Sequence, residues 1–400
     1  MKILMVNKFL HPAGGAETYT FEVGKGLSDK GHDVAYFGME HPGRIVGNRL
    51  NQYVSEKDFH KGGLKQLLYP LSIIYSAEAR RKFTLVMDDL EPDIVHINNF
   101  NYQITPSILY AVRDYMKRNG KRIKTVLTAH DYQLLCPNHL FNNPNTYENC
   151  EKCTNGNYAH CISGRCIHGS WTRSLLGSIE GALYRTLGTY RMFDDIICPS
   201  SFLAGKFEQQ PTFKGKCTVI QNFSQPMRKG DYTRGDYVLF FGRVSPEKGV
   251  GTLIEAAKRL PHIPFIVAGG GPMVDDLAGI ANLKFVGFKR GEDLESLIGQ
   301  ALFTVAPSRW YENCPFSVIE SQLLGTPVIG SNIGGMLELI RQGVDGEFFE
   351  FGNAQALADT IDSLWRDRDR CARYAAACDR KTFIDIDGYV ERVLQVYQKV

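Results

Sequence analysis

The stretch YVLFFGRVSPEKGVGTLIEAAKRL (237–260) shows the plan on which the chain is built. It begins with a short apolar run, passes through a loop of Gly, Pro and charged residues, and continues as a helical pattern at 250–260. Another apolar run, PFIVAG (264–269), follows at once. The order strand, helix, strand predicts a unit of a parallel sheet with helices on its faces.

The same order runs along the rest of the chain. In the first half, apolar runs predict strands at 2–7, 33–38, 93–98, 124–130, 195–200 and 217–222, with helices at 16–30 and 106–119. In the second half, strands are predicted at 283–287, 301–307 and 326–331, with helices near 317–324 and from about 353 onward. We expect an α/β fold of two Rossmann-like, doubly wound domains that face a cleft.

The boundary between the domains is predicted in the polar, turn-rich segment SQPMRKGDYTRGD (224–236). We therefore expect one domain at 1–222, with an insertion at 136–170, and a second at 223–384. The last helix, 385–400, is expected to pack back on the first domain.

Length and composition agree with this plan. A chain of 400 residues exceeds the size at which one core usually keeps growing, so two domains are expected. With 44% hydrophobic and 22% charged residues the chain is globular, and a net charge of +3 is too small to predict nucleic-acid binding. The sequence has no apolar run long enough for a transmembrane helix. The N-terminus reads as a strand without a secretory signal, so we expect a cytoplasmic protein.

Several polar and glycine-rich loops follow the predicted strands. Arg243 and Lys248 can reach one anionic group at the start of a helix, and a diphosphate would fit there, although such charges are often only solvated. Gly14-Gly15 and Gly269-Gly270-Gly271 either let a ligand approach the backbone or form plain turns.

Two glutamates, Glu312 and Glu320, form the most specific pattern. Glu312 lies in a loop after a predicted strand, and Glu320 lies one to two turns inside the next helix. Because the helix around Glu320 is largely apolar, an unpaired charge there is costly. A carboxylate in this position could accept both hydroxyls of a ribose.

These motifs resemble the retaining, nucleotide-sugar-dependent glycosyltransferases of family 4, which have the GT-B fold. The resemblance covers nearly the whole chain, in the order and spacing of the family. It is carried by GGAET (14–18), GRVSPEKG (242–249), GGGP (269–272), FVGF (285–288), Glu312 with Glu320, and IGGMLEL (333–339). Similar members with a Cys-bearing insertion act in bacterial polysaccharide assembly, including that of lipopolysaccharide.

The resemblance implies a role for each matching residue. Arg243 and Lys248 would hold the donor diphosphate, and Glu320 the ribose. Glu312 would hold the donor sugar, and His130, at the end of KTVLTAH (124–130), would lie near the reacting carbon. The implied donor-binding set comprises Gly15, Arg243, Lys248, Gly270, Gly287, Phe288, Lys289, Asn313, Cys314, Pro315, Phe316 and Glu320.

The resemblance also implies the chemistry. A hexosyltransferase would move a sugar from a nucleoside diphosphate sugar, such as a UDP-sugar, to a hydroxyl of a glycan or polyprenyl-diphosphate-linked acceptor. Configuration would be retained, with Arg243 and Lys248 in place of a catalytic metal. The chain departs from the family at Asn313-Cys314-Pro315-Phe316, where Gly-Phe-Gly is typical and Pro315 removes one N–H donor.

Two other functions are compatible with the same fold. Nucleotide-sugar 2-epimerases share it, but they need an acid/base pair, and only His130 and Asp131 are candidates. A non-catalytic nucleotide-sugar-binding protein would not need the intact set of basic residues and glutamates.

Four of the ten cysteines cluster as Cys150, Cys153, Cys161 and Cys166. Thiolates at these spacings suit a structural Zn²⁺, with His160 and His168 as alternative ligands. The alternatives are an iron–sulfur cluster, reduced thiols without any metal, or a disulfide pair formed on oxidation.

Residues 60–86 combine basic and large apolar side chains. They could lie on an anionic membrane, at the inner face of the cell membrane, or they could form ordinary core-facing helices with solvated basic ends.

Overall fold

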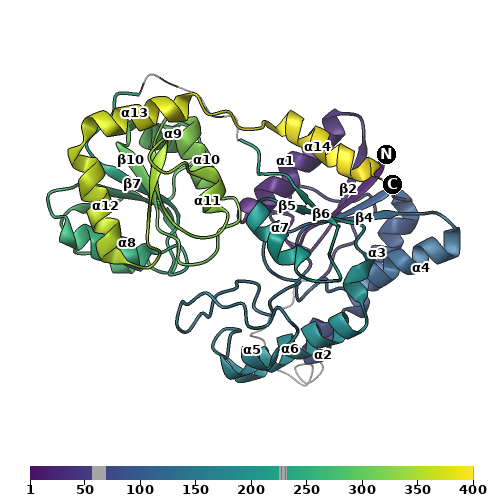
Figure 1. The fold of residues 1–400 in the computed structure, drawn as a ribbon. Coiled ribbons are helices and arrows are strands. Elements are labelled where there is room, and N and C mark those ends of the chain that lie inside the picture. The colour runs from purple at the N-terminus through teal and green to yellow at the C-terminus, as the bar shows by residue number, and fades with distance from the viewer. Residues whose placement is uncertain (56–68, 225–226, 228–229, 231, 400) are drawn as a thin grey trace.

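The computed structural model describes residues 1–55, 69–224, 227, 230 and 232–399. Within them the chain forms two α/β halves, which lie side by side in Figure 1. The first half contains β1 (Lys2–Val6), α1 (Gly15–Asp29), β2 (Asp33–Phe37), α2 (Tyr69–Ile74), α3 (Ala77–Leu90), β3 (Ile94–Ile97), α4 (Ser107–Asn119), β4 (Lys124–Thr128), α5 (Ala159–Ser163), α6 (Trp171–Thr186), the 3-10 helix η2 (Thr189–Met192), β5 (Asp195–Cys198), α7 (Ser201–Glu208) and β6 (Cys217–Val219).

The second half contains β7 (Val238–Arg243), α8 (Val250–Arg259), β8 (Phe265–Gly270), η3 (Asp275–Leu277), β9 (Leu283–Phe285), α9 (Glu292–Gln300), β10 (Phe303–Ala306), α10 (Phe316–Leu323), β11 (Val328–Ser331), α11 (Met336–Leu339), β12 (Gly346–Phe349), α12 (Ala354–Arg366) and α13 (Arg368–Asp379). The last helix, α14 (Ile386–Gln398), follows them in the chain.

Each half is built on a parallel sheet of six described strands, so the expected class is confirmed. The first sheet has the order β2-β1-β3-β4-β5-β6, and the second has the order β12-β11-β10-β7-β8-β9. In such a sheet, ligands bind beyond the carboxyl ends of the two neighbouring strands at which the order reverses. These strands are β1 and β3 in the first sheet and β7 and β10 in the second.

The strands are apolar because helices cover both faces of each sheet. β1 is buried along Ile3, Leu4, Met5 and Val6, and successive residues face two different clusters. Leu4 and Val6 pack with α3 and α4, whereas Ile3 and Met5 pack with α1 and α14.

The last helix returns to the first half. Tyr389, Val390 and Val393 of α14 are fully buried in the same cluster as Ile3. The Tyr389 hydroxyl donates to the Tyr19 hydroxyl of α1 at 3.1 Å. Figure 1 shows α14 beside α1, so the chain crosses between the halves twice.

Some elements differ from the sequence-based expectations. Most predicted strands are shorter than expected: the run at 217–222 forms only β6, Cys217–Val219. The elements α5, α6, α7, α9, α11 and β12 were not predicted. β12 is a four-residue strand at the edge of the second sheet, so it has little pattern to recognise, and α6 exposes its apolar side chains.

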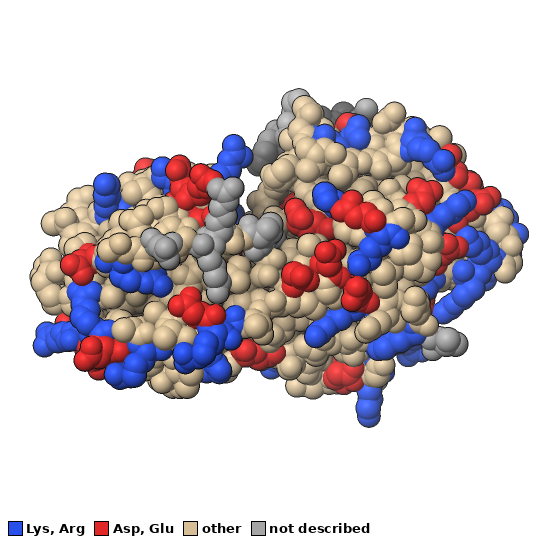
Figure 2. All heavy atoms as spheres, turned by 90° about the horizontal axis from the view of Figure 1, so that it is seen from above, with Lys and Arg blue, Asp and Glu red and all other residues tan. Residues whose placement is uncertain are grey.

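Figure 2 shows the charged side chains on one face of the molecule. On the face seen in Figure 2, acidic and basic side chains alternate over both halves. This distribution agrees with the small net charge of +3.

Candidate active site

The donor-side residues lie where the order of the second sheet reverses. β7 ends at Arg243 with Lys248 in the loop that follows, and Glu312 lies in the loop after β10. The Lys248 Nζ lies 2.6 Å from Oε1 of Glu312. The parallel sheet therefore brings together a cation and a carboxylate that belong to two separate motifs in the sequence.

The Glu312 carboxylate is held by three donors. Besides Lys248, the Ser308 hydroxyl donates to Oε1 at 2.6 Å and the Trp310 indole N–H donates to it at 2.8 Å. Burial alone would raise the pKa of Glu312, but the ion pair with Lys248 and the two hydrogen bonds hold that pKa below its ordinary value. All three contacts fall on Oε1, and within the described residues Oε2 has no partner, so a ligand hydroxyl can bind there.

Arg243 stands at the rim of this site. Its side chain is 69% exposed, and its guanidinium is 4.0 Å from the Glu247 carboxylate. Most of the Arg243 side chain is therefore open to solvent beside the loop that carries Lys248.

Three glycines at the end of β8 have different surroundings. A Cβ at Gly269 would lie 1.9 Å from the Gly242 carbonyl, and one at Gly271 would lie 2.2 Å from the Val244 carbonyl. Those two glycines are needed for close packing of the strand ends. A Cβ at Gly270 meets nothing within 4 Å, so Gly270 is the one that borders open space.

The loop between Glu312 and α10 is tied to the first half of the chain. The Asn313 side-chain amide donates to the His130 carbonyl at 2.9 Å, and the Tyr132 hydroxyl donates to Asn313 Oδ1 at 2.8 Å. Asn222 Nδ2 donates to the Cys314 carbonyl at 2.8 Å, and burial raises the pKa of the Cys314 thiol to about 12. The Asn313 side chain and the Cys314 backbone carbonyl therefore join this loop to the first half.

Three helices begin near this loop without a side-chain cap. They are α1, α8 and α10, whose N-cap residues are Gly14, Gly249 and Pro315. A Cβ at Gly15 would lie 3.6 Å from the Phe316 ring, so α1 and α10 begin in contact, and Gly249 lies against the Pro307 carbonyl at the end of β10. Elsewhere α12, α13 and α14 are each capped by Asn or Asp, whereas α4, α5, α9 and α11 also begin without a side-chain cap. The free N–H groups of α1, α8 and α10 favour an anion.

Glu320 lies in the second turn of α10. Within the described residues its carboxylate has no hydrogen bond or ion pair, and burial raises its pKa to about 7. Glu320 is half-buried, so its carboxylate loses part of its hydration without gaining a partner, and hydroxyl donors from a ligand would offset that loss.

The predicted base-binding segment, Gly287 to Lys289, forms the loop after β9. The Gly287 carbonyl accepts from the Gly269 N–H at 2.9 Å, and Gly287 has a φ of 74° that favours glycine. Phe288 is 76% exposed and Lys289 lies near Asp293 at 3.9 Å. The backbone of this loop is thus anchored to β8 while the Phe288 side chain points outward.

His130 lies across from these residues, at the end of β4. Its Nε2 is 2.9 Å from Asn98 Oδ1, and its ring contacts the edge of Tyr19 at 4.7 Å. Burial lowers the pKa of His130 to about 3, so the imidazole is neutral. With Oδ1 of Asn98 as the acceptor, Nε2 carries the proton and Nδ1 presents a lone pair.

Several residues that hold this arrangement were not predicted from the sequence. They are Asn98, Tyr132, Asn222, Ser308 and Trp310. Tyr132 and Trp310 could have been suspected from the sequence, because each lies two residues from a predicted site residue. Nothing local marks Asn98 or Asn222, because their partners are distant in sequence.

The cysteine cluster is only partly assembled. Cys153 and Cys161 are buried beside Tyr158, with Cys166 packed against them. A hydrogen bond between the Cys161 and Cys166 thiols lowers the pKa of Cys161 to about 7. In the ranges that the structure describes, which include all four predicted ligands, no three His, Cys, Asp or Glu side chains are grouped as a metal requires. The donor set therefore does not fit zinc as it stands, and the zinc site stays a prediction.

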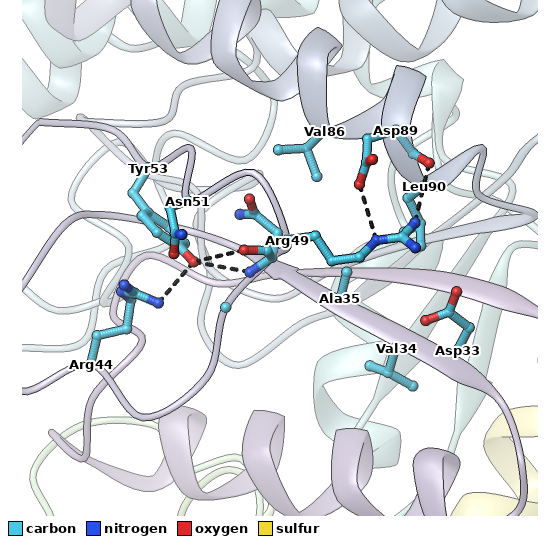
Figure 3. Close-up of a pocket in the computed structure, with 12 residues that line it drawn as sticks. Asp33, Val34, Ala35, Arg44, Arg49, Asn51, Tyr53, Val86, Asp89 and Leu90 are labelled. Carbon is cyan, nitrogen blue, oxygen red and sulfur yellow. Dashed lines mark hydrogen bonds and ion pairs between the residues drawn. The ribbon is translucent and has the colours of Figure 1, made fainter.

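A separate cavity of about 380 Å³ lies beside the edge strand β2 (Figure 3). Its polar groups bind one another: Arg49 pairs with Asp89 at 3.2 Å, and Arg44 donates to the Tyr53 hydroxyl at 2.8 Å. The cavity is lined by Asp33, Val34 and Ala35 at the amino end of β2, whereas the predicted site lies at the carboxyl ends.

The predicted membrane segment, 60–86, falls partly on residues 60–68, which lie outside the described residues. Its remainder forms α2 and most of α3. Among the helices that the structure describes, none is long and apolar enough to cross a bilayer.

Two family models match the chain, one on each half. The model described as Glycosyltransferase Family 4 matches residues 13–154, and the model described as Glycosyl transferases group 1 matches residues 224–380. Both descriptions name glycosyl transfer, which disfavours the epimerase alternative.

Individual proteins are similar to this chain at low identity or over part of its length. An uncharacterized 42.6 kDa protein in the cps region of Klebsiella pneumoniae is 24% identical over 85% of this chain and 88% of its own length. A D-inositol 3-phosphate glycosyltransferase of Mycobacterium bovis is 31% identical, over 36% of this chain and 34% of its own length. The chain therefore matches only about a third of that enzyme.

Solved structures share the fold at low identity. HepE of Anabaena in complex with UDP has a TM-score of 0.67 at 18% identity and covers 100% of both chains. A mutant of S. aureus TarM, in complex with fondaparinux, α-GlcNAc-glycerol and UDP, has a TM-score of 0.67 at 13% identity, also over 100% of both chains. The lipopolysaccharide outer core galactosyltransferase WaaB has a TM-score of 0.61 at 16% identity, over 99% of both chains.

Proposed function

This chain belongs to the family 4 glycosyltransferases with a GT-B fold, and we propose that it transfers a sugar from a UDP-sugar to a hydroxyl of a glycan acceptor with retention of configuration. The observation that carries the proposal is the meeting of α1 and α10 at Gly15 and Phe316, beside the Lys248–Glu312 pair. Two uncapped helix N-termini and a lysine are suited to a diphosphate. The choice of UDP rests on the UDP complexes of HepE and TarM.

In this proposal the second half binds the donor. Lys248, with Arg243 swinging in from the rim, neutralises the diphosphate as it leaves, and the N–H groups of α1 and α10 add to this stabilisation. Glu320 accepts the ribose hydroxyls, and Oε2 of Glu312 accepts a hydroxyl of the donor sugar. Backbone groups of residues 287–289 bind the base.

The first half binds the acceptor. The acceptor hydroxyl attacks the sugar carbon on the face from which the diphosphate departs. The bond from this carbon to the diphosphate oxygen breaks, a bond to the acceptor oxygen forms, and the hydroxyl proton passes to the leaving phosphate. The neutral His130 orients the reacting groups through its Nδ1 lone pair without exchanging a proton.

The acceptor is proposed to be a glycan under assembly, carried on a polyprenyl diphosphate or another lipid. The Klebsiella relative comes from a cps region, and WaaB is described as a lipopolysaccharide outer core enzyme. Both support a role in cell-surface polysaccharide assembly.

A donor-saturated assay tests the proposal. UDP release from UDP-sugars is measured for the native protein and for Lys248→Ala and Glu320→Ala, and each variant is expected to lose most turnover. A thermal-shift panel of UDP and GDP runs beside it, and UDP at a hundredfold excess over its Kd should stabilise the fold by roughly 3 kcal/mol. Near-native rates in both variants, or stabilisation by GDP alone, would contradict the assignment.

A further inference from the structure

Helix α6 carries its large apolar side chains on the outside. Trp171, Leu175, Ile179, Leu183 and Leu187 follow one another at intervals of four residues, so they lie along one face. Trp171 is 53% exposed, Ile179 46%, Leu183 40% and Leu187 61%. A helix of a water-soluble domain normally turns this kind of face toward the core.

The opposite face of α6 packs against the protein, so the helix cannot rotate to bury its apolar side chains. Its buried residues are the small Ser174, Gly177 and Ser178 and, in the last full turn, Tyr184, whose hydroxyl donates to the Ile74 carbonyl. A Cβ at Gly177 would lie 2.4 Å from the Ile167 side chain, and one at Gly181 would lie 3.2 Å from the Tyr158 ring. The inner face therefore has no room for larger side chains at Gly177 and Gly181, and the row of apolar side chains from Trp171 to Leu187 faces outward.

The surroundings of this face are basic. Arg165, Arg173 and Arg185 are exposed, and within the described residues none of them forms an ion pair. Arg185 donates instead to the Thr154 carbonyl at 3.1 Å. The acidic residue of the helix, Glu180, is half-buried, and burial raises its pKa to about 8, so it adds little negative charge at neutral pH.

We propose that the outer face of α6, formed by Trp171, Leu175, Ile179, Leu183 and Leu187, docks on the surface of an anionic lipid bilayer. Large apolar side chains flanked by arginines without an acidic partner match the acyl boundary and the charged headgroups of such a surface. Two such charges on the helix itself, Arg173 and Arg185, argue against a purely apolar partner.

The position of α6 suits a protein that acts beside a membrane. Figure 1 shows α2, α5 and α6 together in a lobe of the first half, away from both termini and from α14. The segment that leads into this lobe begins directly after His130. Docking would therefore hold the acceptor-binding half, rather than the donor-binding half, at the bilayer. This inference does not depend on which sugar is transferred.

The test is cosedimentation with vesicles of phosphatidylglycerol and phosphatidylcholine, and with vesicles of phosphatidylcholine alone. The native full-length protein is expected to bind the anionic vesicles, and less so at high salt. The double variant Ile179→Ser/Leu183→Ser removes two exposed side chains, so it should fold, and its vesicle binding should fall at least tenfold. Leu50→Ser/Val344→Ser is the matched control, since these residues are 41% and 44% exposed outside both α6 and the segment 60–86, and it should bind as the native protein does.

Trp171 supplies a second readout. Its emission should shift to shorter wavelength with anionic vesicles, and the shift should disappear in Trp171→Phe. The proposal is overturned if the native protein ignores anionic vesicles, if the α6 variant binds them equally well, or if equilibrium sedimentation shows that the variant has lost a dimer. Turnover of a soluble acceptor should be unchanged in the α6 variant, so failure of the docking and failure of the proposed reaction can be told apart.

Discussion

The ion pair between Lys248 and Glu312 leads to the most demanding prediction. Lys248→Met removes the cation and leaves a carboxylate whose side chain is 8% exposed. Breaking a buried pair from one side costs about 3–5 kcal/mol. Because Lys248 is 28% exposed and the bonds from Ser308 and Trp310 remain, we expect the lower end, about 3 kcal/mol.

The partner variant should cost less. Glu312→Gln keeps an oxygen for the same two donors, and Lys248 can turn to water, so about 1 kcal/mol is expected. The double variant has no stranded charge and should lose about 2 kcal/mol, which leaves a coupling energy of about 2 kcal/mol between the two residues. For a half of this size, the Lys248→Met loss lowers its melting temperature by about 6–12 °C.

The stability that Glu312 contributes should depend on pH with opposite signs in the native protein and in Lys248→Met. In the native protein the pKa of Glu312 lies below its ordinary value, so its stabilisation is present above that value and is lost as the pH falls through the folded pKa. In Lys248→Met, burial without the cation raises the pKa of Glu312 above its ordinary value. As the pH falls, the folded state therefore binds a proton at Glu312 before the unfolded state does. The destabilisation should therefore shrink as the pH falls from 8 to 5.

Urea unfolding of the four proteins at pH 8 and pH 5 measures both quantities. The reasoning is refuted if the coupling is below about 0.5 kcal/mol, the range of independent sites, or if the Lys248→Met loss is the same at both pH values.

Three further predictions concern the same site. Burial raises the pKa of Glu320 to about 7, and only the ionised carboxylate accepts two ribose hydroxyls, so the affinity for UDP should fall up to about tenfold per pH unit below pH 7. In calorimetric titrations from pH 5.5 to 8.5, Glu320→Gln should bind UDP weakly and with the same affinity at every pH. If the variant keeps the pH dependence of the native protein, Glu320 does not have this role. Gly335→Ala places a Cβ 1.7 Å from the Asn313 carbonyl and should cost about 1–3 kcal/mol in thermal unfolding, whereas the control Gly205→Ala, in open space on α7, should be neutral or stabilising. Asn313→Ala removes the hydrogen bonds to His130 and Tyr132, so kcat should drop at least tenfold while the Kd for UDP changes less than threefold. A parallel loss of UDP affinity would instead assign Asn313 to donor binding.

Much of the fold could be predicted from the sequence because its signals are local. A buried strand, a glycine-rich loop and a helix each occupy a few neighbouring residues, and they recur along the chain. Lys248 and Glu312 could be selected in the same way, since each lies in a recognisable motif after a strand. Their pairing at 2.6 Å could not, because it depends on β7 and β10 being neighbours in the second sheet.

Other features had no local signal at all. Asn98 and Asn222 act on partners supplied by distant segments, and the contact of Gly15 with Phe316 requires both sheets to be in place. For the cysteines, the spacing along the chain predicts four ligands, the described structure packs Cys153, Cys161 and Cys166 together, and the zinc site stays a prediction.

The sequence by itself determined the parallel α/β class, the two-part plan and the residue types that suit a diphosphate and a ribose. The tertiary structure decided which of these residues meet, what charge the buried carboxylates and His130 carry, and which face of α6 points outward. The physical reason is range: hydrophobic periodicity is set by neighbours along the chain, whereas ion pairing, desolvation and exposure are set by what the fold packs against each residue.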